Sequence, residues 1–275
     1  MNINLLKTLC KMKVNDLVRV LTQYLTNKNY KVIATPDYII AEGREPITLI
    51  AHLDTVSDHP PTEIFYDQEQ HIMWSPQLLG ADDRAGVYAI LQILEKGYKP
   101  HIIFTTGEEL GGIGALALSK NYPKCPFKNN KAIIELDRRG LNDCVFYQCN
   151  NRNFVDYIEK FGFKEAYGTF TDISIIAPEW KIAATNLSVG YVNEHSALEH
   201  LSTEALDKTI EKVENIILKI AEMPYFKYIP MKKAKYFRWG GKECLCCGSK
   251  LGRKNKRITP EGYYICDNCY SLYYS

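Results

Sequence analysis

Residues 47–54 read Ile47-Thr48-Leu49-Ile50-Ala51-His52-Leu53-Asp54, an apolar run that ends on an imidazole and a carboxylate. The run predicts a buried strand over 47–51, with His52 placed where the strand ends. On extended backbone, side chains at positions i and i+2 share one face, so Asp54 could accept a hydrogen bond from the His52 ring and fix its tautomer. This pattern is typical of a metal-binding histidine that is oriented by a carboxylate.

Four more metal-binding side chains follow along the chain, each beside the end of a predicted element. Asp82 lies in Gly80-Ala81-Asp82-Asp83-Arg84-Ala85-Gly86, Glu109 follows the apolar run 101–104, Asp137 ends the run 132–137, and His195 comes after 186–191. Ligands of open α/β sheets bind beyond the carboxyl ends of the strands. The five side chains are therefore predicted to converge and to bind two Zn²⁺ ions, with Co²⁺ or Mn²⁺ as alternatives.

The neighbours of these residues suit a hydrolytic site with two metal ions. In Glu108-Glu109, adjacent side chains diverge, so one carboxylate can bind metal while the other faces a water molecule. Asp82 precedes a helical pattern and could bridge two cations about 3.5–4 Å apart. Taken singly, each residue has an ordinary explanation: a structural histidine, a helix cap or a solvated loop. The ordered set is what predicts a metal-dependent hydrolase.

Strand and helix patterns alternate along the first 223 residues. Strands are predicted at 30–34, 37–42, 47–51, 101–105, 131–136, 144–148 and 183–189, a hairpin at 63–66 and 71–74, and helices at 3–26, 82–96, 113–120, 153–161 and 203–223. This order favours an α/β fold, with three layers and a mostly parallel sheet covered by helices on both faces. We expect a catalytic domain over 1–229 and a small cysteine-rich module over 230–275.

The ordered motifs resemble those of the co-catalytic zinc peptidases, the superfamily of M28 aminopeptidases, M20 exopeptidases and deacylases, and M42 aminopeptidases. The set comprises His52-x-Asp54, 80–86, Glu108-Glu109-x-Gly111-Gly112-x-Gly114, Asp137 and His195, and it spans roughly residues 1–222. The resemblance implies that Asp82 bridges two ions. Glu109 and His195 would complete one ion site, and His52 and Asp137 the other. Glu108 would be the general base, and Asp54 would orient His52.

The spacing between ligands departs from part of that superfamily. Only 57 residues separate Asp137 from His195, and only 29 separate His52 from Asp82. Neither interval can hold a further domain of about 100 residues. We therefore expect a bare catalytic domain without a lid insertion, nearest in layout to family M28. Tyr167 lies near the position of an oxyanion-stabilising tyrosine in some M28 enzymes, with a packing role as the competing interpretation, and Asp172 is a candidate supporting residue.

The predicted reaction is hydrolysis of an amide bond in a peptide or an N-acyl amino acid, as in aminopeptidases and deacylases. Glu108 would assist the attack of a metal-bound water. Hydrolysis of a different bond stays open, because such a site specifies activated water rather than the substrate. A binding or adaptor protein that uses the hydrolase domain as a scaffold is the alternative. Every expected catalytic position is filled, which favours the enzyme.

The C-terminal cysteines form a CxxC…CxxC pattern with 18 residues between the inner pair. Cys244, Cys247, Cys266 and Cys269 are the predicted ligands of one structural Zn²⁺, with Cys246 as a competitor. Residues 231–275 hold ten Lys or Arg against three Asp or Glu, a net +7, and the remainder has 24 against 29, a net −5. Such a basic, tyrosine-rich module could contact nucleic acid, but docking on protein is the favoured interpretation.

Composition places the chain among ordinary globular proteins. Its 275 residues are 46% hydrophobic and 24% charged, and no stretch approaches the roughly 18 apolar residues of a membrane span. The apolar N-terminus is broken by Lys7, Lys11, Lys13 and Asp16, which predicts an amphipathic helix and not a signal peptide. Nine cysteines, an odd number with metal-type spacing, do not suggest a disulfide framework. We therefore expect a cytoplasmic protein without membrane contact; the oligomeric state is left open.

Overall fold

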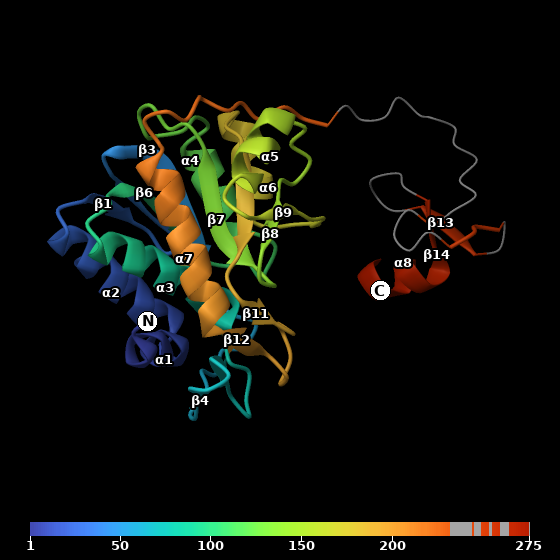
Figure 1. Cartoon of the computed structure of the whole chain (residues 1–275), viewed down its shortest axis with the longest axis horizontal. Coiled ribbons are helices and arrows are strands. Elements are labelled where there is room, and N and C mark those ends of the chain that lie inside the picture. Colours follow the sequence, from blue (N-terminus) through green and yellow to red (C-terminus); the bar gives the residue numbers. More distant parts are fainter. Residues whose placement is uncertain (232–243, 245–248, 253–254, 259–263, 275) are drawn as a thin grey trace. The chain divides into compact units, whose positions relative to one another are not determined.

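The structure is a computed structural model that describes residues 1–231, 244, 249–252, 255–258 and 264–274. The chain divides into two compact units, Met1–Pro230 and Met231–Ser275 (Figure 1). The first unit contains all five predicted ligands of the metal pair, and the second contains the C-terminal cysteines.

An eight-stranded sheet forms the centre of the first unit. Its order is β1-β2-β6-β3-β7-β10-β8-β9. The strands are β1 (Lys31–Ala34), β2 (Tyr38–Glu42), β3 (Glu45–His52), β6 (Pro100–Thr105), β7 (Ile133–Arg138), β8 (Asp143–Val145), β9 (Lys164–Glu165) and β10 (Ala184–Ser188). The four central strands β6, β3, β7 and β10 are parallel to one another. Their carboxyl ends therefore meet at one edge of the sheet.

Helices cover both faces of this sheet, and the strand side chains alternate between two cores. In β3, Leu49 and Ala51 pack into the larger core, while Ile50 packs into the smaller one. The larger core takes α1 (Ile3–Lys11), α2 (Val14–Asn27), α3 (Ala81–Glu95), α5 (Arg152–Glu159) and α7 (Thr203–Leu218), and the smaller takes α4 (Ile113–Asn121) and α6 (Asp172–Trp180). In Figure 1, α3 and α7 lie side by side on one face. The predicted three-layer α/β fold is confirmed.

A second, smaller sheet presents the loop that contains His195. Its order is β11-β12-β5-β4, from β11 (Tyr191–Val192), β12 (His200–Ser202), β5 (Ile72–Trp74) and β4 (Phe65–Asp67). β4 and β5 pair antiparallel, as the predicted hairpin requires. β11 and β12 also pair antiparallel, and residues 193–199 connect them.

One local prediction is wrong in detail, and one helix was not predicted. The single helix expected over 3–26 is two helices, because Met12 is extended (φ −84°, ψ 138°) between them. The buried guanidinium of Arg84 donates hydrogen bonds to the carbonyls of Leu9 and Met12, a tertiary contact that sequence periodicity cannot reveal. Helix α6 had no predicted counterpart: it is rich in apolar residues and contains Pro178, so it lacks an amphipathic signature.

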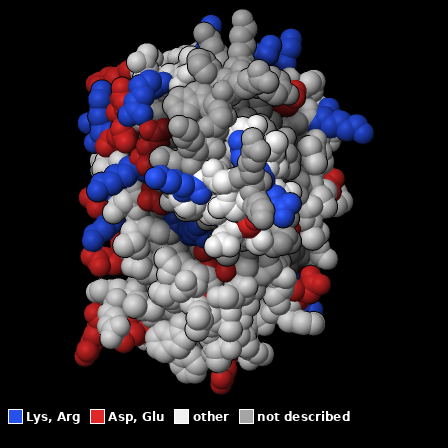
Figure 2. All heavy atoms as spheres, turned by 90° about the vertical axis from the view of Figure 1, so that its right-hand side faces the viewer, with Lys and Arg blue, Asp and Glu red and all other residues white. Residues whose placement is uncertain are grey.

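One face of the chain mixes charges of both signs. On the face shown in Figure 2, Lys and Arg side chains lie among Asp and Glu side chains, most clearly at its left margin. Among the described residues, no helix is both long and apolar enough to span a membrane.

The second unit contains β13 (Lys256–Ile258), β14 (Tyr264–Cys266) and α8 (Asp267–Tyr274). β13 and β14 pair antiparallel. Cys244, Ile265, Cys266 and Cys269 form its small buried cluster. Beside it, the Lys256 ammonium lies 3.4 Å from the centre of the Tyr264 ring.

Candidate active site

The five predicted metal ligands come together at the carboxyl edge of the parallel strands. His52 ends β3, Asp137 lies near the end of β7, and Glu109 lies in the turn after β6. Asp82 lies at the start of α3, and His195 lies in the loop between β11 and β12. Because β6, β3 and β7 are neighbours, the topology alone brings three of these positions to one place.

The carboxylate of Asp82 faces the two histidines with different oxygens. Its Oδ1 lies 3.0 Å from His52 Nε2, and its Oδ2 lies 3.1 Å from His195 Nε2. Asp137 Oδ1 is 3.2 Å from the same His52 nitrogen, and Glu109 Oε1 is 3.0 Å from the same His195 nitrogen. The donors thus form two groups that share Asp82, in the pairing that the family resemblance implies.

In these contacts, carboxylate oxygens outnumber the N–H donors that face them, and divalent cations would balance the excess negative charge. Each imidazole Nε2 carries at most one hydrogen, yet each faces two carboxylate oxygens. Two nitrogen and three carboxylate donors in two adjoining groups match the donor chemistry of Zn²⁺. The residues present therefore fit a pair of such ions.

Asp83, and not Asp82, caps helix α3. Asp82 and Asp83 are non-helical, and the peptide bond between them is cis. Asp83 Oδ1 accepts from the Gly86 N–H at 2.9 Å, the i+3 contact of an N-terminal cap, and its Oδ2 accepts from the His52 N–H at 3.2 Å. The Asp82 carboxylate is thereby left to face the histidines.

Glu199 supports the same turn and was missed by the sequence analysis. Its carboxylate accepts from the N–H groups of Gly80 at 2.8 Å and Asp82 at 3.1 Å. Burial raises the pKa of Glu199 to about 7. The contact spans 117 residues and involves main-chain donors, so no local sequence signal marks it.

Asp54 connects the histidine motif to the glutamate pair. Its two oxygens accept from the N–H groups of Glu108 and Glu109, both at 3.1 Å. The His52 Nδ1 atom lies 3.5 Å from Asp54 Oδ1. In the described part of the chain, no group donates a hydrogen bond to the Glu108 carboxylate. Glu108 is therefore held through its backbone while its carboxylate stays unengaged.

Polar side chains also surround Asp137. Thr171 Oγ1 donates to Asp137 Oδ2 at 2.9 Å, and the Tyr191 hydroxyl donates to the Asp137 carbonyl at 2.7 Å. Asn186 accepts from the Asp137 N–H at 2.9 Å. The predicted supporting residue Asp172 is fully buried next to Thr171 and accepts a hydrogen bond from the Thr105 hydroxyl.

The predicted oxyanion residue Tyr167 lies on the surface. Its side chain is 79% exposed, and its carbonyl accepts from the Arg138 guanidinium at 3.2 Å. Its role stays a prediction, as does that of Asp172.

The ionisable groups of the cluster are strongly perturbed. Hydrogen bonds to Asp82 and Glu109 raise the pKa of His195 to about 10. Burial opposes ionisation of Asp82, but hydrogen bonds from His195 and His52 outweigh it and lower the Asp82 pKa. Burial, reinforced by nearby carboxylates, raises the pKa of Glu108 to about 9. Strong shifts from burial and specific partners are characteristic of functional sites.

In the second unit, three of the four predicted zinc ligands are described. The sulfur atoms of Cys244, Cys266 and Cys269 all lie within 4.8 Å of one another. The Cys266 N–H donates to the Cys244 sulfur at 3.2 Å, a contact common around thiolates that bind metal. Cys247 and its competitor Cys246 lie outside the described residues.

Comparison with known proteins finds a related peptidase family and a shared fold for the first unit. A sequence model of peptidase family M28 matches residues 37–168, a span that contains His52, Asp82, Glu108, Glu109 and Asp137. The fold matches aminopeptidase PepT of Bacillus cereus, with a TM-score of 0.66, 16% identity and coverage of 80% of this chain and 98% of that one. Over residues 37–168 the chain is similar in sequence to peptidase family M28, and its first unit has the fold of an aminopeptidase. The resemblance read from the motifs is thereby confirmed.

Other solved structures share the fold of this metallo-exopeptidase. A tripeptidase of Staphylococcus aureus matches with a TM-score of 0.65, 14% identity and coverage of 80% of this chain and 98% of that one. An aminopeptidase of the archaeon Desulfurococcus kamchatkensis matches with a TM-score of 0.59 and 13% identity. The match covers 80% of this chain and 96% of that one. A search of curated proteins found no match. The family match and the fold together support a peptidase-type hydrolase.

Proposed function

We propose that the chain is a hydrolase with two metal ions that cleaves an amide bond at the end of a short peptide or in an N-acyl amino acid. One observation carries this proposal. The two oxygens of the Asp82 carboxylate face different imidazoles, at 3.0 and 3.1 Å, and each imidazole also meets a second carboxylate. A carboxylate shared in this way is what a pair of adjacent cations requires.

In this proposal, His52, Asp82 and Asp137 hold one ion, and His195, Asp82 and Glu109 hold the other. Zn²⁺ suits the donors, and Co²⁺ and Mn²⁺ are alternatives to be tested. When bound, such ions supply Lewis acidity for water and the substrate carbonyl, and positive charge that lowers the pKa of surrounding carboxyl groups. Asp54 fixes the position of His52 and of the turn that contains Glu108 and Glu109.

Glu108 is the proposed general base. Its carboxylate accepts no hydrogen bond from the described residues, while its backbone is fixed by Asp54. It takes a proton from the attacking water and returns that proton to the nitrogen of the leaving amine. Tyr167 is a proposed hydrogen-bond donor to the carbonyl oxygen, provided that its exposed side chain turns toward a bound substrate.

A cavity of about 690 Å³ beside the cluster is the proposed substrate pocket. Asp54 and Glu109 form the wall next to the ligands, and Val56, Leu110 and Ile113 are among its apolar walls. This lining favours an apolar side chain of the substrate. The names of two matched structures, an aminopeptidase and a tripeptidase, support short peptides as the substrate class.

For the second unit, we propose one structural Zn²⁺ held by Cys244, Cys247, Cys266 and Cys269, with protein rather than nucleic acid as the contact partner. The clustered sulfurs support the ion site. In the first unit, Cys10, Cys125, Cys144 and Cys149 are free thiols, which supports a reducing, cytoplasmic environment.

The proposal is tested by assaying the purified chain on aminoacyl p-nitroanilides, tripeptides and N-acetyl amino acids. We expect release of a free amino acid that a chelator abolishes and added Zn²⁺, Co²⁺ or Mn²⁺ restores. Absence of hydrolysis with every metal and all three substrate classes would contradict the proposal.

A further inference from the structure

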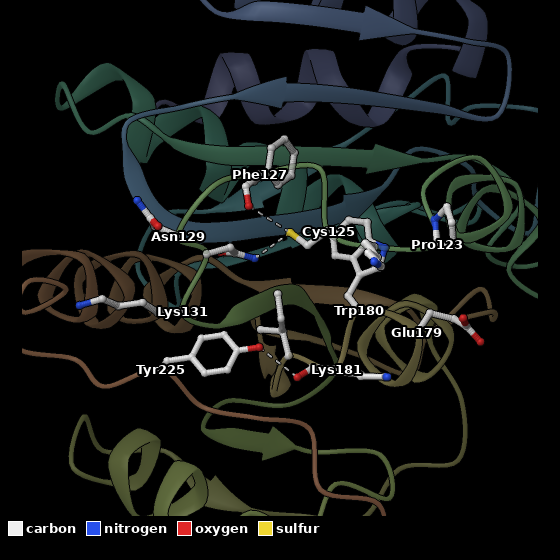
Figure 3. A pocket seen from close by; sticks show the side chains of 12 residues that line it. Pro123, Cys125, Phe127, Asn129, Lys131, Glu179, Trp180, Lys181 and Tyr225 are labelled. Carbon is white, nitrogen blue, oxygen red and sulfur yellow. Dashed lines mark hydrogen bonds between the residues drawn. The ribbon is translucent and has the colours of Figure 1, made fainter.

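A second cavity lies at the opposite edge of the central sheet from the metal cluster. Its volume is about 770 Å³, and it is bounded by the loop 123–131, by 179–182 at the end of α6, and by Tyr225 (Figure 3). β7 begins beside it at Ile133, whereas Asp137 lies near the other end of that strand. Four residues of strand span about 13 Å. The cavity is therefore separate from the catalytic cluster.

One buried polar group in the wall of this cavity lacks a partner. The side chain of Asn130 is only 4% exposed. Its amide nitrogen donates to the Cys125 sulfur at 3.7 Å, but its Oδ1 accepts no hydrogen bond from the residues that the structure describes. Buried amide oxygens are normally hydrogen-bonded. This oxygen has almost no accessible surface, so an N–H or O–H donor of a bound molecule would satisfy it once the Asn130 side chain turns toward the cavity.

The charged side chains around the cavity favour an anion. Lys124, Lys131 and Lys181 line it, against one acidic residue, Glu179. The Lys131 ammonium is occupied by the carbonyls of Ile220 and Ala221, at 2.8 and 3.1 Å. Within the described part of the chain, Lys124 and Lys181 form no ion pair with an acidic side chain. Two ammonium groups therefore remain available to a ligand.

Aromatic rings supply the apolar part of the lining. Phe127 and Trp180 meet edge to face, with ring centroids 6.4 Å apart. The Trp180 N–H is already used, since it donates to the Tyr122 carbonyl at 2.8 Å. Tyr225 lies across the cavity from Trp180, and its hydroxyl donates to the Lys181 carbonyl (Figure 3). Its half-exposed ring is a surface on which a planar group can stack.

We propose that this cavity binds a small anion joined to a planar ring that carries an N–H donor. The anionic group pairs with Lys124 and Lys181, the ring packs against Tyr225, and the N–H donates to Asn130 Oδ1. Two sources share this chemistry. One is a nucleotide, with a phosphate as the anion, and the other is an aromatic amino acid such as tryptophan, with a carboxylate.

The test is calorimetric titration of the full chain with adenosine monophosphate and, separately, with tryptophan. We expect at least one to bind with a Kd below about 1 mM. The double variant Lys124→Gln/Lys181→Gln should weaken that binding at least about tenfold, because it removes both charge-assisted contacts. Lys160→Gln/Lys164→Gln changes two exposed lysines outside the cavity and should leave binding unchanged.

Binding of adenosine monophosphate alone would assign the phosphate source, and binding of tryptophan alone the carboxylate source. Asn130→Asp keeps the acceptor but adds a negative charge, so it should weaken either ligand. The proposal is overturned if neither ligand binds at 1 mM (a Kd above about 1 mM), or if the Lys124→Gln/Lys181→Gln variant binds as tightly as the natural chain. Because heat of binding is measured rather than hydrolysis, the outcome does not depend on the catalytic proposal.

Discussion

At the scale of single residues, the backbone and the side chain of Glu108 have different environments, and a substitution of the side chain tests the proposed role as general base. Its backbone contacts Asp54, and its carboxylate accepts no hydrogen bond from the described residues. Glu108→Gln should therefore lower kcat by about 10²–10⁴, the usual contribution of a general base, while metal content stays unchanged. The matched control Glu211→Gln, at an exposed position of α7, should be neutral. A Glu108→Gln enzyme with natural turnover would show that the base is another residue.

The perturbed groups of the cluster also predict how stability depends on pH. The pKa of His195 is raised to about 10 and that of Glu108 to about 9. Both shifts are upward, so the stability they contribute is complete below the unfolded-state pKa of each group and is lost as pH rises toward the folded-state value. For His195 the window runs upward from an ordinary pKa of about 6.5.

The melting temperature of chelated protein should therefore fall between pH 6.5 and pH 9.5, a range that covers most of the His195 shift from 6.5 to about 10. Thermal scans at both values, with His195→Asn as the comparison, measure the effect. The variant should show a smaller decline. A melting temperature that rises with pH over this range would contradict the described environment of these groups.

The clustered residues could be predicted from sequence because each follows a visible strand or precedes a visible helix. His52 and Asp137 end apolar runs, and the topology of a parallel sheet brings such ends together. Glu199 could not be found this way, since it reaches Asp82 through a main-chain N–H far away along the chain. Asp83 was visible only as the neighbour of Asp82, and its capping contact depends on the non-helical backbone of that turn.

At the scale of elements, Arg84 ties α1 to the strand end that holds His52. Its buried guanidinium donates to the carbonyls of Leu9, Met12 and Leu53. Arg84→Lys cannot make all three contacts, so unfolding free energy should fall by about 2–4 kcal/mol. Denaturant unfolding tests this, with Arg139→Lys as the control. Arg139 pairs with Glu194 at the surface, so that substitution should lower the free energy of unfolding by less than about 1 kcal/mol. An equal loss of unfolding free energy in both variants would show that the three hydrogen bonds of Arg84 do not stabilise the fold in this way.

Helix α3 packs on β7 through a glycine. A Cβ atom at Gly86 would lie 1.8 Å from the Leu136 carbonyl oxygen, next to Asp137. Gly86→Ala should therefore push the helix from the strand and lower stability by about 1–3 kcal/mol, with weaker metal binding. Lys120→Ala, at an exposed position of α4, is the control. A Gly86→Ala protein as stable as the natural chain would show that this contact is not tight.

Sequence periodicity predicted the elements whose own residues show an apolar run or a helical spacing of apolar residues. The strands at 47–51 and 101–105 correspond to β3 and β6, and the helix at 82–96 corresponds to α3. The break after Lys11 could not be predicted, because Arg84, far along the chain, takes the carbonyls of that turn. The strands β9, β11 and β12 have two or three residues each, too few for a period to be seen.

At the scale of the whole molecule, the two units should respond separately to loss of metal. Cys266→Ser should remove one Zn²⁺ equivalent and destabilise 231–275, because a module of this size needs the ion to fold. Hydrolysis by the first unit should persist. Metal analysis and activity, compared with Cys125→Ser, check this. Unchanged zinc content in the Cys266→Ser protein would contradict the proposal that the C-terminal cysteines bind Zn²⁺.

The central claim concerns Asp82, and anomalous diffraction from crystals grown with Zn²⁺ tests it most directly. The predicted result is two peaks about 3.5–4 Å apart, one between His52 and Asp137, the other between His195 and Glu109, with one oxygen of Asp82 directed at each. A single peak, or none between the two histidines, would contradict the account.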